Sequence, residues 1–329
     1  MFTDLDEAAL WQYRSAAQEP DDLDAFWLRT LSESGEYPLD VTLSPVDAGL
    51  ESVDVWDVTF AGFGGHVIAA WLLLPTNNEE RLPAVVQYLG YGGGRGNPLD
   101  HLLWPTAGYA TLVMDTRGQG SGHSAGVTPD PVGSGPSFPG HLTRGIDHPD
   151  NYYYRRVYVD AVRAVDVLRA HPRVDSSQLF ATGGSQGGGI AIAVAALRRD
   201  LTAIAAHVPF LCDLRRASVL TDNPPYQELG RYLAVHRTDA DRVFHTLSYF
   251  DGVNLARRAQ AHALFSAALM DATCPPSTVF GAFHNYGGPK SITVWPYNGH
   301  EGGGVEDRAE ALRMFNRLRV ATPERWPRE

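Results

Sequence analysis

The sequence predicts an α/β fold in which a mostly parallel central sheet is covered by helices on both faces. Short apolar runs with little alternation, such as 83–89 and 109–114, have the pattern of strands buried on both faces. These runs alternate with helical patterns, of which 152–170 is the strongest because its apolar residues recur at helical spacing. Strand–helix alternation over this length is typical of one layered domain, so we expect residues 1–329 to form a single unit.

The composition is that of a globular protein and excludes several classes of partner. The chain has 329 residues, 44% hydrophobic and 20% charged, with a net charge of −11. This acidic balance argues against nucleic acid and anionic membranes as partners. The acidic N-terminus has no signal-peptide pattern, and the longest apolar run, 67–74, is too short to span a bilayer. We therefore expect a soluble cytoplasmic protein, in which the two cysteines, Cys212 and Cys274, are buried and reduced rather than paired.

The N-terminal part is predicted to form a helical extension, residues 1–50, followed by a hairpin. Residues 6–34 look helical, with a break at Pro20 where a second helix opens. Residues 52–60 alternate between apolar and polar, and 67–74 are apolar, with a glycine-rich turn between them. This pattern predicts an antiparallel hairpin at the start of the sheet.

The rest of the chain supplies the alternating elements and two insertions. Strands are predicted at 83–89, 109–114, 178–182, 203–208, 263–270 and 291–295, and helices at 100–105, 152–170, 186–199 and 305–320. Residues 121–150 are rich in glycine and proline, and residues 211–254 are mixed and helical in parts. Long insertions of this kind are commonly lids or binding loops, so both segments are predicted to be lid-like.

The leading candidate for a catalytic residue is Ser185, in Gly-Gly-Ser-Gln-Gly at 183–187. Gly-x-Ser-x-Gly between a strand and a helix describes a sharp turn with the serine at its apex. Glycine two residues before and after the serine relieves the crowding of such a turn, because it has no Cβ. The strand at 178–182 and the helix at 186–199 supply this context. Some glycine-rich turns have no catalytic role, so the motif alone leaves both interpretations open.

A serine nucleophile needs a base and an orienting carboxylate. In folds of this type they follow the serine in the order acid, histidine, at strand ends on one edge of the sheet. Asp271 follows the strand at 263–270, and His300 lies in a glycine-rich loop after the strand at 291–295. We predict that His300 accepts the Ser185 proton and that Asp271 fixes the histidine tautomer.

Two other residues compete for these roles. His284 is the nearest alternative base, but it lies in a helix predicted after Pro276. Glu301 is an alternative carboxylate; it adjoins His300 in sequence and is more simply explained as structural.

Attack by serine creates an oxyanion, which needs prearranged hydrogen-bond donors. The backbone N–H of Gln186, at the start of the helix after the nucleophile, is one predicted donor. The loop 90–96, after the strand at 83–89, is glycine-rich and contains Tyr91, whose N–H is the second predicted donor. A plain glycine-rich turn is the alternative interpretation of this loop.

Other chemistries do not match the residues. The glycines at 90–96 and 118–122 do not form a dinucleotide-binding fingerprint, and the chain has no Gly-x-x-x-x-Gly-Lys. His300 and Glu301 are followed by glycines rather than by the second histidine of a zinc helix. We therefore expect no cofactor and no metal.

Three linked motifs give the chain a specific resemblance. They are Asp-Thr-Arg-Gly-Gln-Gly at 115–120, Gly-Gly-Ser-Gln-Gly-Gly at 183–188 and His-Glu at 300–301. Together they resemble the signature of carbohydrate esterase family seven, the acetyl xylan esterases that also act as cephalosporin C deacetylases. The similarity extends from about residue 21 to the last helix.

The resemblance implies an α/β-hydrolase fold with Ser185, Asp271 and His300 as triad and with Tyr91 and Gln186 as oxyanion donors. It also implies that the Arg-Gly-Gln-Gly element, with Arg117 and Gln119, is a structural brace near the site.

The same resemblance implies a serine carboxylesterase that deacetylates small acetylated substrates, such as xylo-oligosaccharides and cephalosporin C, through an acetyl-enzyme. Members of this family are usually intracellular and often form hexamers, so a homo-oligomer is expected. Two alternatives stay open at this point: a broad short-chain esterase or peptidase of the same fold, and a non-catalytic ligand-binding relative.

Overall fold

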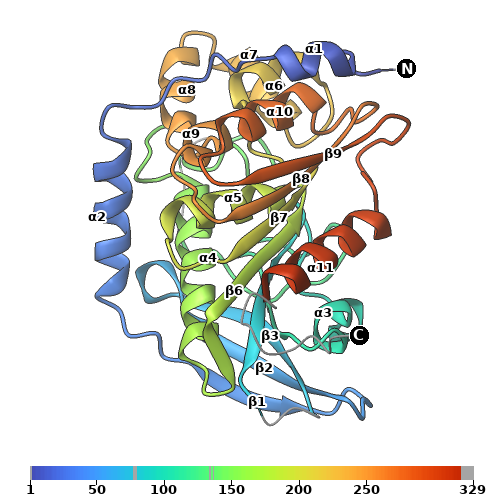
Figure 1. Cartoon of the computed structure of the whole chain (residues 1–329). Helices are drawn as coiled ribbons and strands as arrows, with labels where there is room; N and C mark the ends of the chain where they lie inside the picture. Colours follow the sequence, from blue (N-terminus) through green and yellow to red (C-terminus); the bar gives the residue numbers. More distant parts are fainter. Residues whose placement is uncertain (1, 77–79, 133–134, 136, 320–329) are drawn as a thin grey trace.

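The computed structural model describes residues 2–76, 80–132, 135 and 137–319, and a single mixed sheet runs through them (Figure 1). The strand order is β1-β2-β3-β5-β4-β6-β7-β8-β9. The strands are β1 (Thr42–Val46), β2 (Val53–Ala61), β3 (Val67–Pro75), β4 (Leu82–Tyr88), β5 (Ala110–Met114), β6 (Val174–Gly184), β7 (Ala203–His207), β8 (His262–Ala268) and β9 (Lys290–Trp295). The α-helices are α1 (Glu7–Gln12), α2 (Leu23–Gly35), α3 (Leu103–Thr106), α4 (Tyr153–Ala170), α5 (Gln186–Leu197), α6 (Leu214–Leu220), α7 (Gln227–Val235), α8 (Ala240–Ser248), α9 (Gly252–Ala256), α10 (Pro276–Asn285) and α11 (Val305–Arg319).

The sheet is antiparallel at one end and parallel through the rest. β1 pairs with β2, β2 with β3, and β3 with β5 in antiparallel fashion, which confirms the predicted hairpin. From β5 through β4, β6, β7 and β8 to β9, every neighbouring pair is parallel. The carboxyl ends of these strands therefore meet at one edge of the sheet, where ligand sites of α/β folds are found.

Helices cover both faces of the parallel part, as predicted. In Figure 1, α4 and α5 lie on one side of the sheet, and α3 and α11 lie on the other. Neighbouring residues of β6 point to opposite faces: Ala181 belongs to the core under α4 and α5, whereas Phe180 stacks on Phe315 of α11 with ring centroids 4.6 Å apart. Burial on both sides explains why these strands read as continuous apolar runs rather than as alternating ones.

The N-terminal extension contains one element that the sequence did not indicate. Residues 1–50 were expected to be helical, and α1 and α2 are, but Thr42–Val46 forms the edge strand β1. Most of β1 is exposed, and Pro45 lies within it. An exposed edge strand needs no apolar alternation and tolerates proline, so β1 left no pattern to detect.

The two insertions differ in structure. The described part of 121–150 contains turns and one short antiparallel bridge, Ser121 with Ala125. Residues 211–254 contain α6, α7 and α8 and the start of α9, which confirms their partly helical character. The end of the predicted helix at residue 320 lies outside the described residues.

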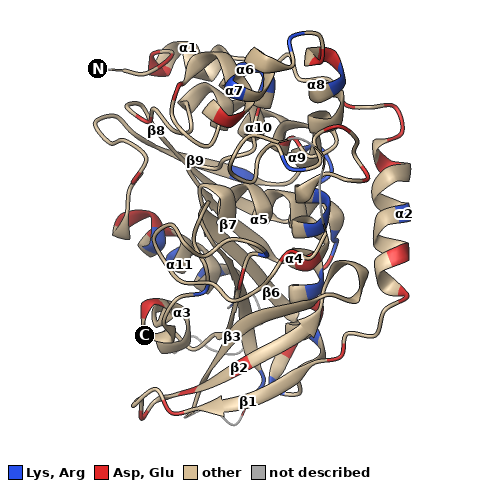
Figure 2. Ribbon diagram, turned by 180° about the vertical axis from the view of Figure 1, so that it is seen from behind, with Lys and Arg blue, Asp and Glu red and all other residues tan. Residues whose placement is uncertain are grey.

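Charged side chains gather around the sheet rather than in it. Figure 2 shows Lys, Arg, Asp and Glu mainly on helices and loops, whereas β7 and β8 carry none of them. Among the described helices, none is long and apolar enough to cross a membrane.

Candidate active site

Ser185 stands at a sharp turn between β6 and α5. It is the N-cap of α5, with φ 54° and ψ −119°, a conformation that residues with a side chain rarely adopt. A Cβ at Gly187 would collide with the carbonyl oxygen of Tyr88, and one at Gly183 would collide with the backbone of Gly187. Both motif glycines are therefore required by close backbone approach. The strained turn presents the serine hydroxyl beyond the sheet edge.

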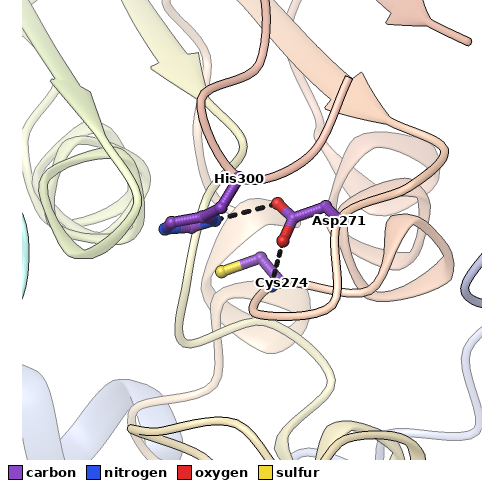
Figure 3. Close-up of side chains that lie close together, drawn as sticks. All are labelled: Asp271, Cys274 and His300. Atoms are coloured by element: carbon purple, nitrogen blue, oxygen red, sulfur yellow. Dashed lines mark hydrogen bonds and ion pairs between the residues drawn. The ribbon is translucent and has the colours of Figure 1, made fainter. Parts of the chain in front are cut away.

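His300 and Asp271 reach Ser185 from the two strands at the far end of the sheet. His300 Nε2 lies 3.0 Å from Ser185 Oγ. His300 Nδ1 lies 2.9 Å from Asp271 Oδ2 (Figure 3). The Asp271 side chain is fully buried, whereas 35% of the His300 side chain is exposed. In the arrangement that satisfies all three groups, Ser185 donates to Nε2 and Nδ1–H donates to Asp271. The structure thus brings the three predicted residues into one hydrogen-bonded chain.

The second carboxylate oxygen of Asp271 fixes the loop that carries it. Oδ1 accepts the backbone N–H groups of Thr273 and Cys274, at 2.8 and 2.9 Å. The Asp271 loop and the His300 loop are also tied to each other, because Met270 N–H donates to the carbonyl oxygen of Asn298. Both side chains are therefore held by their own backbones before any substrate arrives.

Cys274 lies directly beside the hydrogen-bonded residues Asp271 and His300. Its sulfur, one carboxylate oxygen of Asp271 and one ring nitrogen of His300 lie within 4.8 Å of one another (Figure 3). Burial raises the pKa of the Cys274 thiol well above its usual value, and a hydrogen bond with Ser185 opposes this only in part. The carboxylate already accepts three hydrogen bonds, so the hydrogen-bonded chain accounts for this cluster without a metal ion. Cys274 and Cys212 are both free and buried.

The two predicted oxyanion donors are available. Among the described residues, neither the N–H of Tyr91 nor that of Gln186 has a hydrogen-bond acceptor. Gln186 follows Ser185 at the first position of α5, where the helix dipole favours negative charge. Tyr91 follows β4, the neighbour of β6 in the sheet. Two N–H groups without an acceptor, one on the loop after β4 and one at the start of α5, are what a developing oxyanion requires.

The Arg-Gly-Gln-Gly element braces these loops. Gln119 Oε1 accepts the N–H of Gly92 at 2.6 Å, and Gln119 Nε2 donates to Gln186 Oε1 at 2.8 Å. Arg117 is fully buried and is paired with Asp160, Nε to Oδ2, at 2.6 Å. Gln119 therefore links the Tyr91 loop to Gln186, the residue after Ser185, and Arg117 anchors the element that carries Gln119.

The two competing residues do not join the Ser185–His300–Asp271 hydrogen bonds. His284 lies in α10 and its Nε2 bonds to the carbonyl oxygen of Leu10, so it packs against the N-terminal segment. Glu301 accepts from Asn298 Nδ2 at 3.0 Å and from Gly299 N–H at 3.2 Å. The Asn298 hydrogen bond lowers the pKa of the Glu301 carboxyl. Glu301 thus holds the loop that carries His300.

One buried carboxylate near the site was not predicted. Glu228 of α7 accepts a hydrogen bond from the Tyr91 hydroxyl at 2.5 Å. In the sequence, Glu228 is a polar residue in a segment of mixed composition, which is also the pattern of an exposed glutamate. No signal in its neighbourhood could have found it, because its partner lies 137 residues away.

Comparisons of the sequence and of the structure with known proteins both find acetyl xylan esterases. A family model described as acetyl xylan esterase (AXE1) matches residues 1–318. An acetyl xylan esterase from a Paenibacillus species has 36% sequence identity and a TM-score of 0.90, covering 95% of this chain and 99% of the other. Acetyl xylan esterase 1 from a Thermoanaerobacterium species has 32% identity and a TM-score of 0.88, covering 96% and 99%.

A curated relative and a more distant structure extend the comparison. Acetyl esterase Axe7A of Xylanibacter ruminicola is 28% identical over 289 residues, which are 86% of this chain and 64% of that protein. The match thus spans somewhat less than two thirds of its length. An acylaminoacyl peptidase of Pyrococcus horikoshii, at 14% identity and a TM-score of 0.60 over 86% of this chain and 44% of that one, shares the α/β-hydrolase fold alone.

Proposed function

This chain belongs to the acetyl xylan esterase family, and on that premise we propose that it is a serine carboxylesterase that removes acetyl groups from small acetylated carbohydrates. The observation that carries the proposal is the continuous chain from Ser185 through His300 to Asp271, with hydrogen-bond distances of 3.0 and 2.9 Å. A serine, a base and a buried carboxylate in this order are what acyl transfer needs.

In the first half of the proposed reaction, Ser185 Oγ attacks the acetyl carbonyl carbon while His300 Nε2 takes its proton. Asp271 holds the imidazole in the correct tautomer and stabilises the imidazolium. The N–H groups of Tyr91 and Gln186 stabilise the oxyanion. Collapse of the tetrahedral species breaks the ester bond, and the alcohol leaves with the proton from His300.

In the second half, water replaces the alcohol. His300 Nε2 takes a proton from the water as its oxygen attacks the acetyl-enzyme, and the same two N–H groups stabilise the second oxyanion. The Ser185–carbonyl bond then breaks, Ser185 recovers its proton from His300, and acetate leaves. The cycle needs no group beyond those that the chain provides.

Replacing the nucleophile tests the proposal. Ser185→Ala should reduce hydrolysis of a chromogenic acetate ester by at least about 10⁴-fold, because the covalent route is lost. An unchanged circular dichroism spectrum serves as the control for folding. Full activity in the variant would rule out this assignment.

Acetylated xylo-oligosaccharides are the proposed natural class of substrate, by analogy with the names of the similar enzymes. Cephalosporin C is a second proposed acetate ester. A rate panel across acetylated xylo-oligosaccharides, cephalosporin C and simple alkyl acetates separates these possibilities. A chain-length series that peaks at octanoate would contradict the preference for acetyl groups.

We also propose, by analogy with the family, a cytoplasmic homo-oligomer, with a hexamer as the proposed assembly. Sedimentation velocity of the purified full chain tests the assembly. A monomer at all concentrations would exclude it.

A further inference from the structure

The hydroxyl of Tyr91 joins the oxyanion loop to both insertions. It donates to Glu228 Oε1 at 2.5 Å and accepts from the backbone N–H groups of His141, at 2.5 Å, and Leu142, at 3.2 Å. Glu228 belongs to the insertion 211–254, whereas the two backbone groups belong to the insertion 121–150. Three segments that are distant in sequence therefore meet at one phenolic oxygen.

Glu228 is a buried carboxylate whose partners are a phenol and backbone amides. Only 5% of the residue is exposed, and its Oε2 accepts the N–H of Leu142 at 2.9 Å. The Gly140 backbone lies so close that a Cβ there would collide with the carboxylate. Burial raises the pKa of Glu228 above its usual value, although these hydrogen bonds oppose the shift. A buried carboxylate costs free energy unless its oxygens are hydrogen-bonded, as those of Glu228 are.

Glu228 holds the side chain of Tyr91, a residue whose neighbours on both sides are hydrogen-bonded through their backbones. On the N-terminal side, Gln186 Nε2 donates to the carbonyl oxygen of Leu89 at 3.1 Å. Gly92, the next residue, is fixed by Gln119 and by the N–H groups of Gly120 and Gly122, which both donate to its carbonyl oxygen. The N–H of Tyr91 has no acceptor among the described residues, so its direction must be set by the rest of the residue. The bond from the phenol to Glu228 fixes the side chain of Tyr91 as well as the backbone around it.

The Tyr91 ring is also connected to Ser185 through one intervening residue, Phe210. It makes an edge contact with Phe210, with centroids 5.9 Å apart, and the N–H of Phe210 donates to the carbonyl oxygen of Ser185 at 2.9 Å. The Tyr91 side chain is therefore packed against the segment that is hydrogen-bonded to Ser185. The position of an oxyanion donor matters because a displacement of about 1 Å can cost up to about 100-fold in rate.

We propose that Glu228 is a positioning residue for the oxyanion hole. By accepting the Tyr91 hydroxyl proton in a hydrogen bond, it holds the Tyr91 N–H toward the oxyanion, and the two insertions act as the support of that donor. This inference rests on the proposed esterase function.

Two single variants and their combination test the role. Glu228→Gln keeps the size of the side chain but has only one acceptor atom, so it cannot satisfy both Tyr91 and Leu142. Tyr91→Phe removes the other end of the bond and keeps the backbone N–H. Glu36→Gln is a matched control, because Glu36 is exposed at the end of α2. Each protein is assayed with p-nitrophenyl acetate and with a trifluoromethyl ketone, which adds to the serine and forms an oxyanion.

The expected result is a loss specific to the transition state. In both single variants kcat should fall by about 10- to 100-fold, and affinity for the ketone should fall by the same factor. KM and the melting temperature should change little, because the interaction is made in the transition state. The double variant should lose no more than the worse single variant, since both remove the same bond.

Other results would overturn the role. Unchanged kcat, a loss confined to KM or to the melting temperature, or losses that multiply in the double variant would each contradict it. If Glu228→Gln does not fold, Tyr91→Phe gives the same measurement from the other end of the bond. An inactive wild type would refute the proposed function, whereas an active wild type with unaffected variants would refute this inference alone.

Discussion

Two histidine–aspartate pairs lie at the same edge of the sheet, and only one of them is arranged for proton transfer. His300 bonds to Asp271 at 2.9 Å and to Ser185 at 3.0 Å. His207 ends β7, and its Nδ1 lies 3.8 Å from Asp307 Oδ2, too far for a hydrogen bond. Its two ring nitrogens are buried and have no hydrogen-bond partner among the described residues.

The partners of the two aspartates explain the difference. Asp271 keeps Oδ2 for His300 and gives Oδ1 to backbone N–H groups. Asp307 accepts Ser266 Oγ–H and Gly303 N–H at Oδ2, and Trp295 Nε1–H at Oδ1. These three bonds join the start of α11 to β8, to the end of β9 and to the His300 loop, and none of them goes to His207. Under the proposed mechanism, the same two residue types thus serve proton transfer in one place and loop anchoring in the other.

Replacing the two histidines should give the largest contrast. His300→Ala should lower kcat for a chromogenic acetate ester by about 10⁴-fold or more, because the general base is lost. His207→Leu should lower it by less than about 10-fold, because the His207 ring bonds to no reacting group. Comparable losses in the two variants would show that the pairs are not distinct.

Replacing the two aspartates should give the next contrast. Asp271→Asn should reduce kcat by about 10⁴-fold, since an amide that donates to Nδ1 favours the wrong imidazole tautomer. Asp307→Asn should reduce it by about 10-fold at most, through the His300 loop. Rates measured above and below neutral pH provide the check, and an Asp307 loss as large as that of Asp271 would assign Asp307 to the reaction.

Asp307, whose replacement should affect kcat little, should matter strongly for the free energy of unfolding. Asp307→Ala should lower the free energy of unfolding by about 3 kcal/mol, because it leaves three donors without their acceptor. Glu306→Ala, at the exposed neighbouring position, should change it by less than about 0.5 kcal/mol. Urea unfolding followed by tryptophan fluorescence measures both. Equal effects would mean that the Asp307 contacts contribute no net stability.

The smallest expected effect is a pH dependence of stability. Burial lowers the pKa of His207 below 6.5, although Asp307 opposes the shift. The unfolded chain therefore binds a proton at this site before the folded chain does. The resulting stability is present above pH 6.5 and is lost as the pH falls through the folded pKa. His207→Leu should lose less unfolding free energy than the wild type between pH 7 and pH 5; an equal loss would contradict the assignment.

The hydrogen-bonded arrangement of Ser185, His300 and Asp271 could be predicted from sequence because each member sits at a strand end with a local signature. Ser185 has its glycines, His300 has a glycine-rich loop, and Asp271 closes an apolar run. Such signatures arise because the backbone geometry of a turn restricts the residues around it.

Glu228 and the edge strand β1 could not be predicted, and the reasons are physical. The burial of Glu228 depends on Tyr91 and Leu142, which only the fold brings near it. The β1 strand is exposed along most of its length, so its sequence lacks the apolar alternation from which a strand is predicted. The proximity of His207 to Asp307 could not be predicted either, because no local sequence motif marks either residue.

Detection of the acetyl-enzyme tests the central claim most directly. The full chain is mixed rapidly with p-nitrophenyl acetate, quenched in acid and digested, and the peptide containing Ser185 is examined by mass spectrometry. The account predicts one added acetyl group on Ser185, formed before steady state and missing in His300→Ala. Turnover of the ester with no acetyl group on Ser185, or with the acetyl group on another residue, would contradict it.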